Sequence, residues 1–388
     1  MDVPGYIWTL TIVGILGLLA FDFIFHVRKA HEPTLKEAAI WSSIYVGIAI
    51  LFGIGILVFG GATAGSEYFA GYITEKALSV DNLFVFLIIM ASFAVPRADQ
   101  QKVLLFGIVF ALIARTGFIL IGAAAISAFS WVFYLFGAIL IFTAVNLLRP
   151  HDESGKDPLM VRVAKRLIKT SDNYDGDKFF TVENGKRVLT PMLLVIVAIG
   201  LTDILFALDS VPAIYGLTEN VFIVFTATAF SLLGLRQLYF LIDGLLDRLV
   251  YLSIGLAAIL AFIGVKLVLH ALHENTLPFI NGGEHVEVFE ISTGLSLSVI
   301  VGILVVTVIA SLLSPKGRAR NFASAIRRHA TDAVDSSKPH DERAESFERM
   351  RATQQKAEAL PEKHRTAVVA DESLQAAVAR AHEEHTPR

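Results

Sequence analysis

The 388-residue sequence contains no cysteine and few charged residues for its length. The absence of cysteine excludes disulfide bonds and thiolate metal ligands. Charged residues make up 18% of the chain and hydrophobic residues 54%, and the mean hydropathy is +0.61. Soluble domains carry about 25% charged residues. The composition therefore indicates a membrane protein.

Long apolar segments recur along most of the chain. A helix needs about 20 mainly apolar residues to cross a bilayer. Nine segments qualify: 5–26, 38–58, 68–93, 103–125, 129–148, 191–214, 221–242, 249–272 and 295–313. The first has no basic leader and no small-residue cleavage site, so we interpret it as a retained span. The expected fold is an all-α membrane protein with about nine transmembrane helices.

Lysine and arginine are distributed unevenly between the connections. They are absent from residues 1–4 and from the loops near 61–67, 126–128, 215–220 and 273–294, whereas the loop 149–190 alone carries nine. Basic residues in short loops stay on the cytoplasmic side of a membrane. We therefore expect a multi-pass plasma-membrane protein with its N-terminus outside and its C-terminus in the cytoplasm.

The spans and their connections predict seven parts. They are two N-terminal spans (1–60), a first three-helix unit (61–148), a cytosolic loop (149–190), a second three-helix unit (191–272), an extracytoplasmic loop (273–294), a last span (295–314) and a cytosolic charged tail (315–388).

The cytosolic loop and the tail are the main polar segments. In the loop, Asn184-Gly185 between β-forming residues predicts a small hairpin, and a short helix is expected around 159–169. The tail is rich in Ala, Glu, Arg and His, which predicts loose helices or disorder. Both segments could hold cytosolic partners of unknown identity. We interpret the extracytoplasmic loop, with its His and Glu residues, as an ordinary solvated loop.

Two apolar spans each carry two carboxylates six residues apart. They are Glu75 with Asp81 and Asp203 with Asp209, and the two pairs are 128 positions apart. An ionised carboxylate in hydrocarbon costs at least about 2.5 kcal/mol, so such residues usually face a cavity, a partner or a substrate. These four residues are the predicted metal ligands. Further oxygen ligands could come from Ser79, Asn82, Ser210 and Asp22.

The order of features around the two motifs is the same. Each acidic span is followed by a span with a buried arginine (Arg115 or Arg236) and then by one with a glycine (Gly137 or Gly264). Three spans per unit is an odd number, so the two units have opposite polarity in the membrane. This order predicts two inverted three-helix repeats with a site at the midplane between interrupted helices.

The architecture predicts specific positions for the charges. We expect the two acidic helices to be broken close to Asp81 and Asp209, with these carboxylates facing each other. Arg115, Arg236, Lys76 and Lys266 are expected to be counter-charges or gates rather than ligands. The alternative is that Asp81 or Asp209 only pairs with one of the arginines to hold helices together.

Four segments in this order resemble the TerC family of integral membrane proteins. They are GYITEKALSVDNLFVF, FFTVENGKRVLTP, DILFALDSVPAIYGLT and LLGLRQLYF, and the resemblance extends from about Glu67 to Lys266. It implies an inner-membrane protein related to manganese exporters and tellurium resistance, with a LysE-like transporter architecture. The family's acidic positions correspond to Glu75, Asp81, Asp203 and Asp209. Many members have Glu three residues before the third of these, where this chain has Gly200.

Oxygen ligands without thiolates suit hard divalent ions such as Mn²⁺, Ca²⁺ or Mg²⁺. Protons would compete with the ion for the same carboxylates, which offers a route to proton coupling. The sequence therefore predicts export of a divalent ion, manganese foremost, by a protein in the lipid bilayer without a resident cofactor. The alternative is a membrane scaffold or assembly factor in metal or tellurite stress. No enzymatic or nucleic-acid-binding motif is found.

Overall fold

The structure is a computed structural model of the chain. It describes residues 3–27, 34–148, 161, 163, 166, 170, 171, 176, 178–183, 186–242, 249–275, 277, 280–335, 340–362 and 372–385. The side chains of Asp81, Phe84, Ala98, Ile242, Glu372 and Ser373 lie outside this description. The predicted helix around 159–169 lies mostly outside the described residues.

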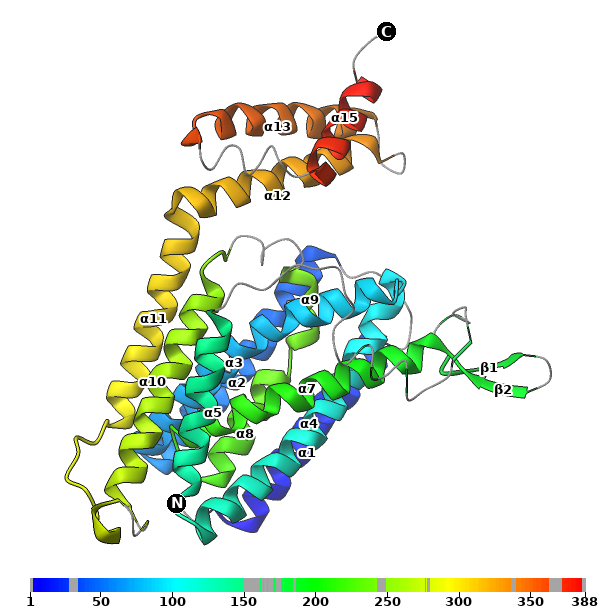
Figure 1. Ribbon diagram of the computed structural model, residues 1–388. Helices are drawn as coiled ribbons and strands as arrows, with labels where there is room; N and C mark the ends of the chain where they lie inside the picture. The colour runs from blue at the N-terminus through cyan, green and yellow to red at the C-terminus, as the bar shows by residue number, and fades with distance from the viewer. Residues whose placement is uncertain are drawn as a thin grey trace. The chain divides into compact units, whose positions relative to one another are not determined.

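The chain divides into two compact units. The first comprises Met1–Leu241 and Leu256–Ile303, and the second comprises Ile242–Gly255 and Leu304–Arg388. Along the chain, the membrane part consists of α1 (Gly5–Asp22), a π-helical turn η1 (Phe23–Val27), α2 (Leu35–Gly60), α3 (Ala62–Ser92), α4 (Arg97–Ala128), α5 (Val132–Leu147), α7 (Pro191–Tyr215), α8 (Val221–Leu232), α9 (Leu235–Ile242), α10 (Leu252–His273) and α11 (Thr293–Leu313) (Figure 1).

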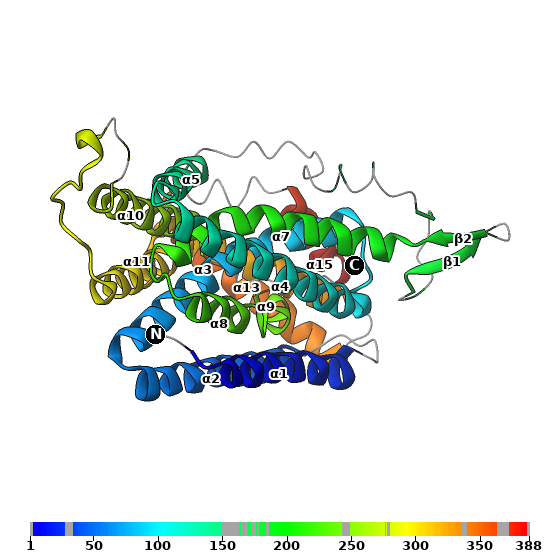
Figure 2. The ribbon, with the colours of Figure 1, turned by 90° about the horizontal axis from the view of Figure 1, so that it is seen from below.

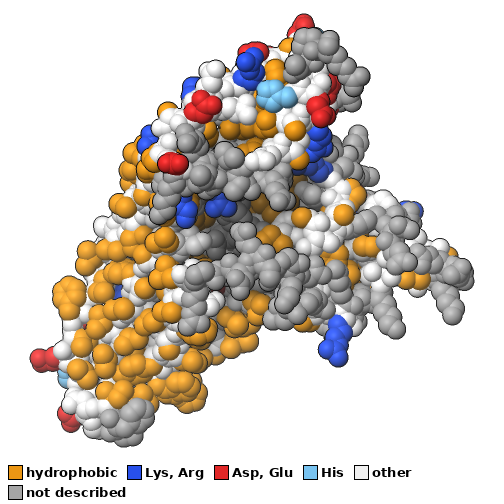
Figure 3. All heavy atoms as spheres, turned by 45° about the horizontal axis from the view of Figure 1, so that its top comes forward, with side chains coloured by type: hydrophobic (Ala, Val, Ile, Leu, Met, Phe, Trp, Pro, Cys, Tyr) orange, Lys and Arg blue, Asp and Glu red, His pale blue; other side chains and the backbone are white. Residues whose placement is uncertain are grey.

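Most of these helices suit a membrane. Among the described residues, seven helical segments are long and apolar enough to cross one, and α5, with 16 residues, is a shorter apolar helix. The 31-residue α3 is long enough but carries the charged residues of the first acidic motif. Large hydrophobic side chains cover broad areas of the surface (Figure 3). The chain is thus an all-α membrane protein.

Four helices form the centre of the first unit. Helix α3 packs against α7 and α8, and α4 packs against the same two helices (Figures 1 and 2). Helix α2 packs against α3 and α8, and α1 contacts α8. Tyrosines join this group through backbone carbonyls: Tyr68 Oη donates to Ala49 O (3.0 Å) and Tyr215 Oη donates to Ile119 O (2.6 Å). Buried hydroxyls thereby gain partners that lipid cannot provide.

The interruption of the helices is not where the sequence analysis placed it. Helices α3 and α7 run continuously through Asp81 and Asp209, so the expected breaks there are wrong. Pro212 lies in the last turn of α7 without ending the helix. The break instead separates α8 from α9, where Leu233 is extended and Gly234 has φ +78°. A positive φ is readily adopted only by glycine.

The loops predicted to be extracytoplasmic lie at one end of the first unit. Residues 67, 215–219 and 290–293 line one pocket, and Tyr134 Oη, near the start of α5, donates to Asn275 Oδ1 (3.3 Å). Pro4 lines a second pocket with Phe59 and Gly60 at the end of α2. The side chain of Asn275 also donates to the carbonyls of Ile280 (2.7 Å) and Glu284 (3.1 Å), so this loop is folded around an asparagine.

The predicted hairpin is confirmed. Strand β1 (Phe180–Glu183) pairs antiparallel with β2 (Lys186–Leu189), and the register joins Phe180 to Leu189 and Glu183 to Lys186. This register leaves two residues between the strands, as the Asn-Gly pair predicts.

The tail forms a small helical bundle within the second unit. Helices α12 (Pro315–Val334), α13 (His340–Glu358) and α15 (Glu372–His385) pack together. Their core contains Ile326, Phe347, Met350 and Leu374 together with several alanines. The expectation of loose helices or disorder is therefore wrong for the described part of the tail. Alanine is a strong helix former, and its small side chain allows close packing that composition alone does not reveal.

Candidate functional site

A buried charge cluster lies between three central helices. Glu75 lies near the middle of α3, Asp203 near the middle of α7, and Arg115 comes from α4. Their exposed fractions are 0%, 1% and 0%. Ionised groups at such depth require partners, because isolated charges are strongly disfavoured away from water.

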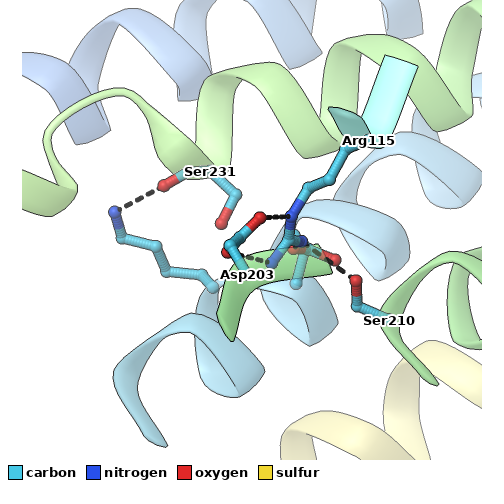
Figure 4. A network of polar contacts seen from close by, with 6 residues as sticks. Arg115, Asp203, Ser210 and Ser231 are labelled. Carbon is cyan, nitrogen blue, oxygen red and sulfur yellow. Dashed lines mark hydrogen bonds and ion pairs between the residues drawn. The ribbon is translucent and has the colours of Figure 1, made fainter. Parts of the chain in front are cut away.

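Arg115 supplies those partners. Its Nε donates to Asp203 Oδ2 (2.9 Å) and its Nη2 to Asp203 Oδ1 (3.0 Å), which makes a bidentate pair (Figure 4). Its Nη1 donates to Ser210 Oγ (2.9 Å) and forms an ion pair with Glu75 Oε1. One guanidinium thus joins the carboxylates that stand 128 positions apart in the two motifs. The predicted role of Arg115 as a counter-charge fits this geometry.

Hydroxyl groups on α3 and α8 are also buried. The side-chain oxygens of Thr74 and Ser79 on α3 and of Thr228 and Ser231 on α8 have no hydrogen-bond partner among the described residues. Helices α3 and α8 pack against each other. Buried hydroxyls without partners are rare in proteins and often indicate a bound water or ion. The oxygen-rich donor set therefore fits a hard cation.

The break between α8 and α9 connects directly to the first acidic motif. A helix that ends inside a protein leaves backbone carbonyls without helical partners. The ammonium Nζ of Lys76, the residue after Glu75, donates to the carbonyl of Ser231 at 3.0 Å. Lys76 is therefore a cation held at the broken helix.

A second buried ion pair involves the other arginine. Arg236, at the start of α9, donates from Nε to Asp22 Oδ2 (3.1 Å) and from Nη2 to Asp22 Oδ1 (2.7 Å). Gln237 Nε2 donates to Asp22 Oδ1 (3.0 Å), and Arg236 also contacts Gln101. The π-helical turn η1 begins immediately after Asp22. Asp22 therefore holds α1 to the segment after the helix break.

The remaining predicted ligands are placed less completely. The side chain of Asp81 lies outside the described residues, and Asp209 is half-buried. Asn82 is buried. The predicted approach of Asp81 to Asp209 therefore stays a prediction. Within the part of the chain that the structure describes, no three His, Asp or Glu side chains are arranged as a ready metal site.

Lys266 belongs to a different location. It lines a pocket of about 470 Å³ at the end of the helices together with Glu67, Glu219, His270 and Glu290. Thr218 Oγ1 donates to Glu67 Oε2 (2.5 Å), and His270 Nε2 lies 3.2 Å from Glu219 Oε1. Hydrogen bonding to His270 lowers the pKa of Glu219. Lys266 thus lies among the carboxylates of this pocket, and its role as a counter-charge or gate stays a prediction.

Gly200, where the resemblance led us to expect an acidic residue in many relatives, is closely packed. A Cβ atom on Gly200 would lie 2.5 Å from Cδ1 of the Phe110 ring. The space beside Asp203 that a longer side chain would need is therefore occupied by Phe110.

Sequence analysis did not single out several residues of the two clusters. These are Ser231, Gly234, Gln101 and Gln237. The signal available for the break was a glycine inside an apolar span, in LLGLRQ. The glutamines gave no separate signal, because their role depends on helices far apart in the chain.

The fold and the buried cluster define a polytopic α-helical membrane protein with paired charges in its interior. Residues 60–319 match the model of the integral membrane protein TerC family, and the chain belongs to this family. It is 55% identical over 390 residues to an uncharacterised membrane protein of Mycobacterium bovis, with 98% of each chain covered.

More distant relatives match less of the chain. An uncharacterised membrane protein of Myxococcus xanthus is 38% identical, with 81% of this chain and 93% of the relative covered. The Escherichia coli K12 protein Alx, described by its name as a membrane-bound redox modulator, is also 38% identical, with 78% of this chain and 93% of Alx covered. No solved structure matches the chain.

Proposed function

We propose that this protein exports a hard divalent cation, manganese foremost, across the plasma membrane by alternating access. The N-terminus is outside and the C-terminus in the cytoplasm, as the distribution of basic residues indicates. The observation that carries the proposal is the single guanidinium of Arg115 between Glu75 and Asp203. It holds together one acid from each acidic motif, deep among the helices.

Packing supports two inverted repeats within nine spans. A two-fold relation between the two three-helix units would exchange α3 with α7 and α4 with α8. The packing of α3 on α8 then corresponds to the packing of α7 on α4, and both contacts are present. Gly137 on α5 and Gly264 on α10 also meet: a Cβ on either would lie within about 3.0 Å of the other's carbonyl oxygen. Corresponding residues of two repeats meet in this way near a shared axis.

The cluster suggests how an ion is bound and released. An entering cation competes with Arg115 for the carboxylates of Glu75 and Asp203, and nearby hydroxyl oxygens complete its coordination. Asp81 and Asp209, six residues further along the same helices, are the second pair of ligands. When the ion leaves, Arg115 compensates the acids again, and protons compete for the same oxygens.

The experiment measures manganese in cells that overproduce the protein. We expect lower cell-associated manganese and greater tolerance of manganese in the medium. Asp203→Asn, Asp81→Asn and Asp209→Asn should each abolish this effect while the protein still accumulates in the membrane. Glu345→Gln, on the exposed surface of α13, is the matched control and should keep it. Unchanged manganese content at full membrane expression would contradict export.

The alternative is a membrane scaffold, and the folded tail bundle favours it because such a bundle offers a surface for partners. A scaffold needs no ion between the acidic motifs. If the three Asp→Asn variants keep manganese tolerance but deletion of the tail abolishes it, the scaffold is the better description. The absence of cysteine means that a redox role would have to proceed without thiols.

A further inference from the structure

Helix α12 differs in charge from the rest of the tail bundle. It carries five basic residues and one acidic residue, whereas α13 and α15 together carry five basic and eight acidic residues. The basic residues begin three positions after Leu313, the last residue of the apolar helix α11. Because a spanning helix ends at the membrane interface, these charges start at the level of the lipid head groups.

The junction between α11 and α12 is a defined elbow. Ser314 is extended (ψ 151°), its Oγ accepts from the Gly317 amide (3.0 Å), and Pro315 occupies the first turn of α12. A Cβ on Gly317 would lie 1.7 Å from the carbonyl oxygen of Ser311. Only glycine fits there, so α12 turns sharply away from the end of α11 (Figure 1).

The apolar face of α12 is already covered. Ala319, Ile326, Ala330 and Ala333 are buried in the core of the bundle. Helix α12 therefore has no apolar face left to insert into the acyl region, as an amphipathic membrane helix does. Attraction between this helix and a membrane must be electrostatic.

The basic side chains are exposed and grouped. Lys316, Arg318, Arg320, Arg327 and Arg328 are all exposed. Lys316, Arg320 and Arg327 are spaced i, i+4 and i+11, which places them within about 40° of one another around the helix. They flank the covered face and form a basic stripe along α12.

We propose that α12 lies along the membrane surface and binds the head groups of anionic phospholipids through this basic stripe. Each basic residue near the surface raises the affinity for an anionic membrane roughly fivefold, so several together hold the bundle at the membrane. The binding is screened by salt, because it has no apolar component.

The cysteine-free chain allows a direct test on the full-length protein. Thr331 is exposed and lies on the same side of α12 as the basic stripe. Thr331→Cys is labelled with a fluorophore, and the protein is reconstituted into vesicles containing a lipid with a nitroxide at its head group. Quenching should be strong in vesicles of phosphatidylglycerol and phosphatidylethanolamine and weak in phosphatidylcholine alone. Half-molar salt should remove most of the difference.

Charge variants test the assignment to α12. Lys316→Gln, Arg320→Gln and Arg327→Gln combined should weaken the preference for anionic vesicles over neutral ones roughly 100-fold. The matched control neutralises Arg349, Arg351 and Lys356 on α13 and should leave the preference unchanged. Equal quenching in both kinds of vesicle, or equal loss in the two triple variants, would overturn the proposal. Circular dichroism of each variant verifies that the bundle remains folded.

Discussion

Arg115 compensates two buried acids at once, so its removal should cost more than the loss of one contact. We expect Arg115→Met to lower the free energy of unfolding by about 3–5 kcal/mol, because two carboxylates remain buried without a counter-charge. Combining it with Glu75→Gln and Asp203→Asn should recover most of this loss. The measurement is the apparent Tm of the detergent-solubilised protein.

The pattern of recovery tests the assignment of charges. Arg236→Met with the same two acid variants provides the comparison, because Arg236 pairs with Asp22 instead. The apparent Tm of Arg236→Met should not recover when Glu75→Gln and Asp203→Asn are added. Equal Tm values for Arg115→Met alone and in combination would mean that the acids are not its electrostatic partners.

At this scale the sequence identified the charged residues but not the pairing of Arg115 with Glu75 and Asp203. Glu75, Asp203 and Arg115 stood out because ionisable residues in apolar spans are conspicuous. The pairing of Arg236 with Asp22 was not predicted, because these residues are 214 positions apart and Asp22 lies outside the repeated units. Their contact depends on how α1 packs, which a local pattern does not specify.

At the scale of elements, the close approach of α5 and α10 depends on two glycines. A Cβ on Gly137 would lie 2.9 Å from the carbonyl oxygen of Gly264 and 2.8 Å from a methyl of Val268. We expect Gly137→Ala to destabilise the protein by about 1–3 kcal/mol, since backbone must shift. Gly117→Ala on α4 meets nothing within 4 Å. It should be neutral or slightly stabilising, because alanine favours the helix. Thermal unfolding of both variants in detergent distinguishes these outcomes, and equal Tm values would contradict the contact.

The break between α8 and α9 makes a second prediction about glycine. Gly234→Ala combines a positive φ with a Cβ only 2.8 Å from Cβ of Tyr45. The backbone strain alone costs roughly 1–3 kcal/mol, and the contact adds to it. Gly61→Ala has a similar φ of +93° with nothing within 4 Å, so it isolates the strain. The apparent Tm should fall further for Gly234→Ala; an equal fall would show that Tyr45 yields without cost.

The sequence predicted the helices more successfully than their interruptions. Apolar length and composition located most of the spans, because burial in lipid depends on these properties. Seven of the described helical segments qualify as spans. Ser79, Asn82 and Pro212 suggested breaks in α3 and α7, yet both helices continue. Serine and asparagine lower helix propensity only modestly, so Ser79 and Asn82 do not by themselves end α3. Pro212 lies three residues before the end of α7, so its missing N–H affects only the last turn of the helix. The actual break lies at the glycine with positive φ.

At the scale of the whole molecule, the two compact units predict separable stability. Met350 is 0% exposed in the core of the tail bundle. We expect Met350→Ala to cost about 2–5 kcal/mol and to expose the amides of α12, α13 and α15 to hydrogen exchange. The amides of α3, α4, α7 and α8 should keep their protection. Loss of protection throughout the molecule would show that the two units unfold together. Met90→Ala, in the buried part of α3, is the reciprocal control and should leave the tail protected.

The fixed position of Arg115 has an electrical consequence for ion movement. Arg115, Glu75 and Asp203 together carry a formal charge of −1. The guanidinium is covalently part of α4, so in the proposed cycle it stays at the site when an ion leaves, and the cluster returns to the same formal charge. In the proposed export, each divalent ion moves two positive charges against an inside-negative potential, which costs roughly 5 kcal/mol per 100 mV. Protons entering in exchange would return that charge, so the membrane potential favours an antiporter over an uncoupled pore.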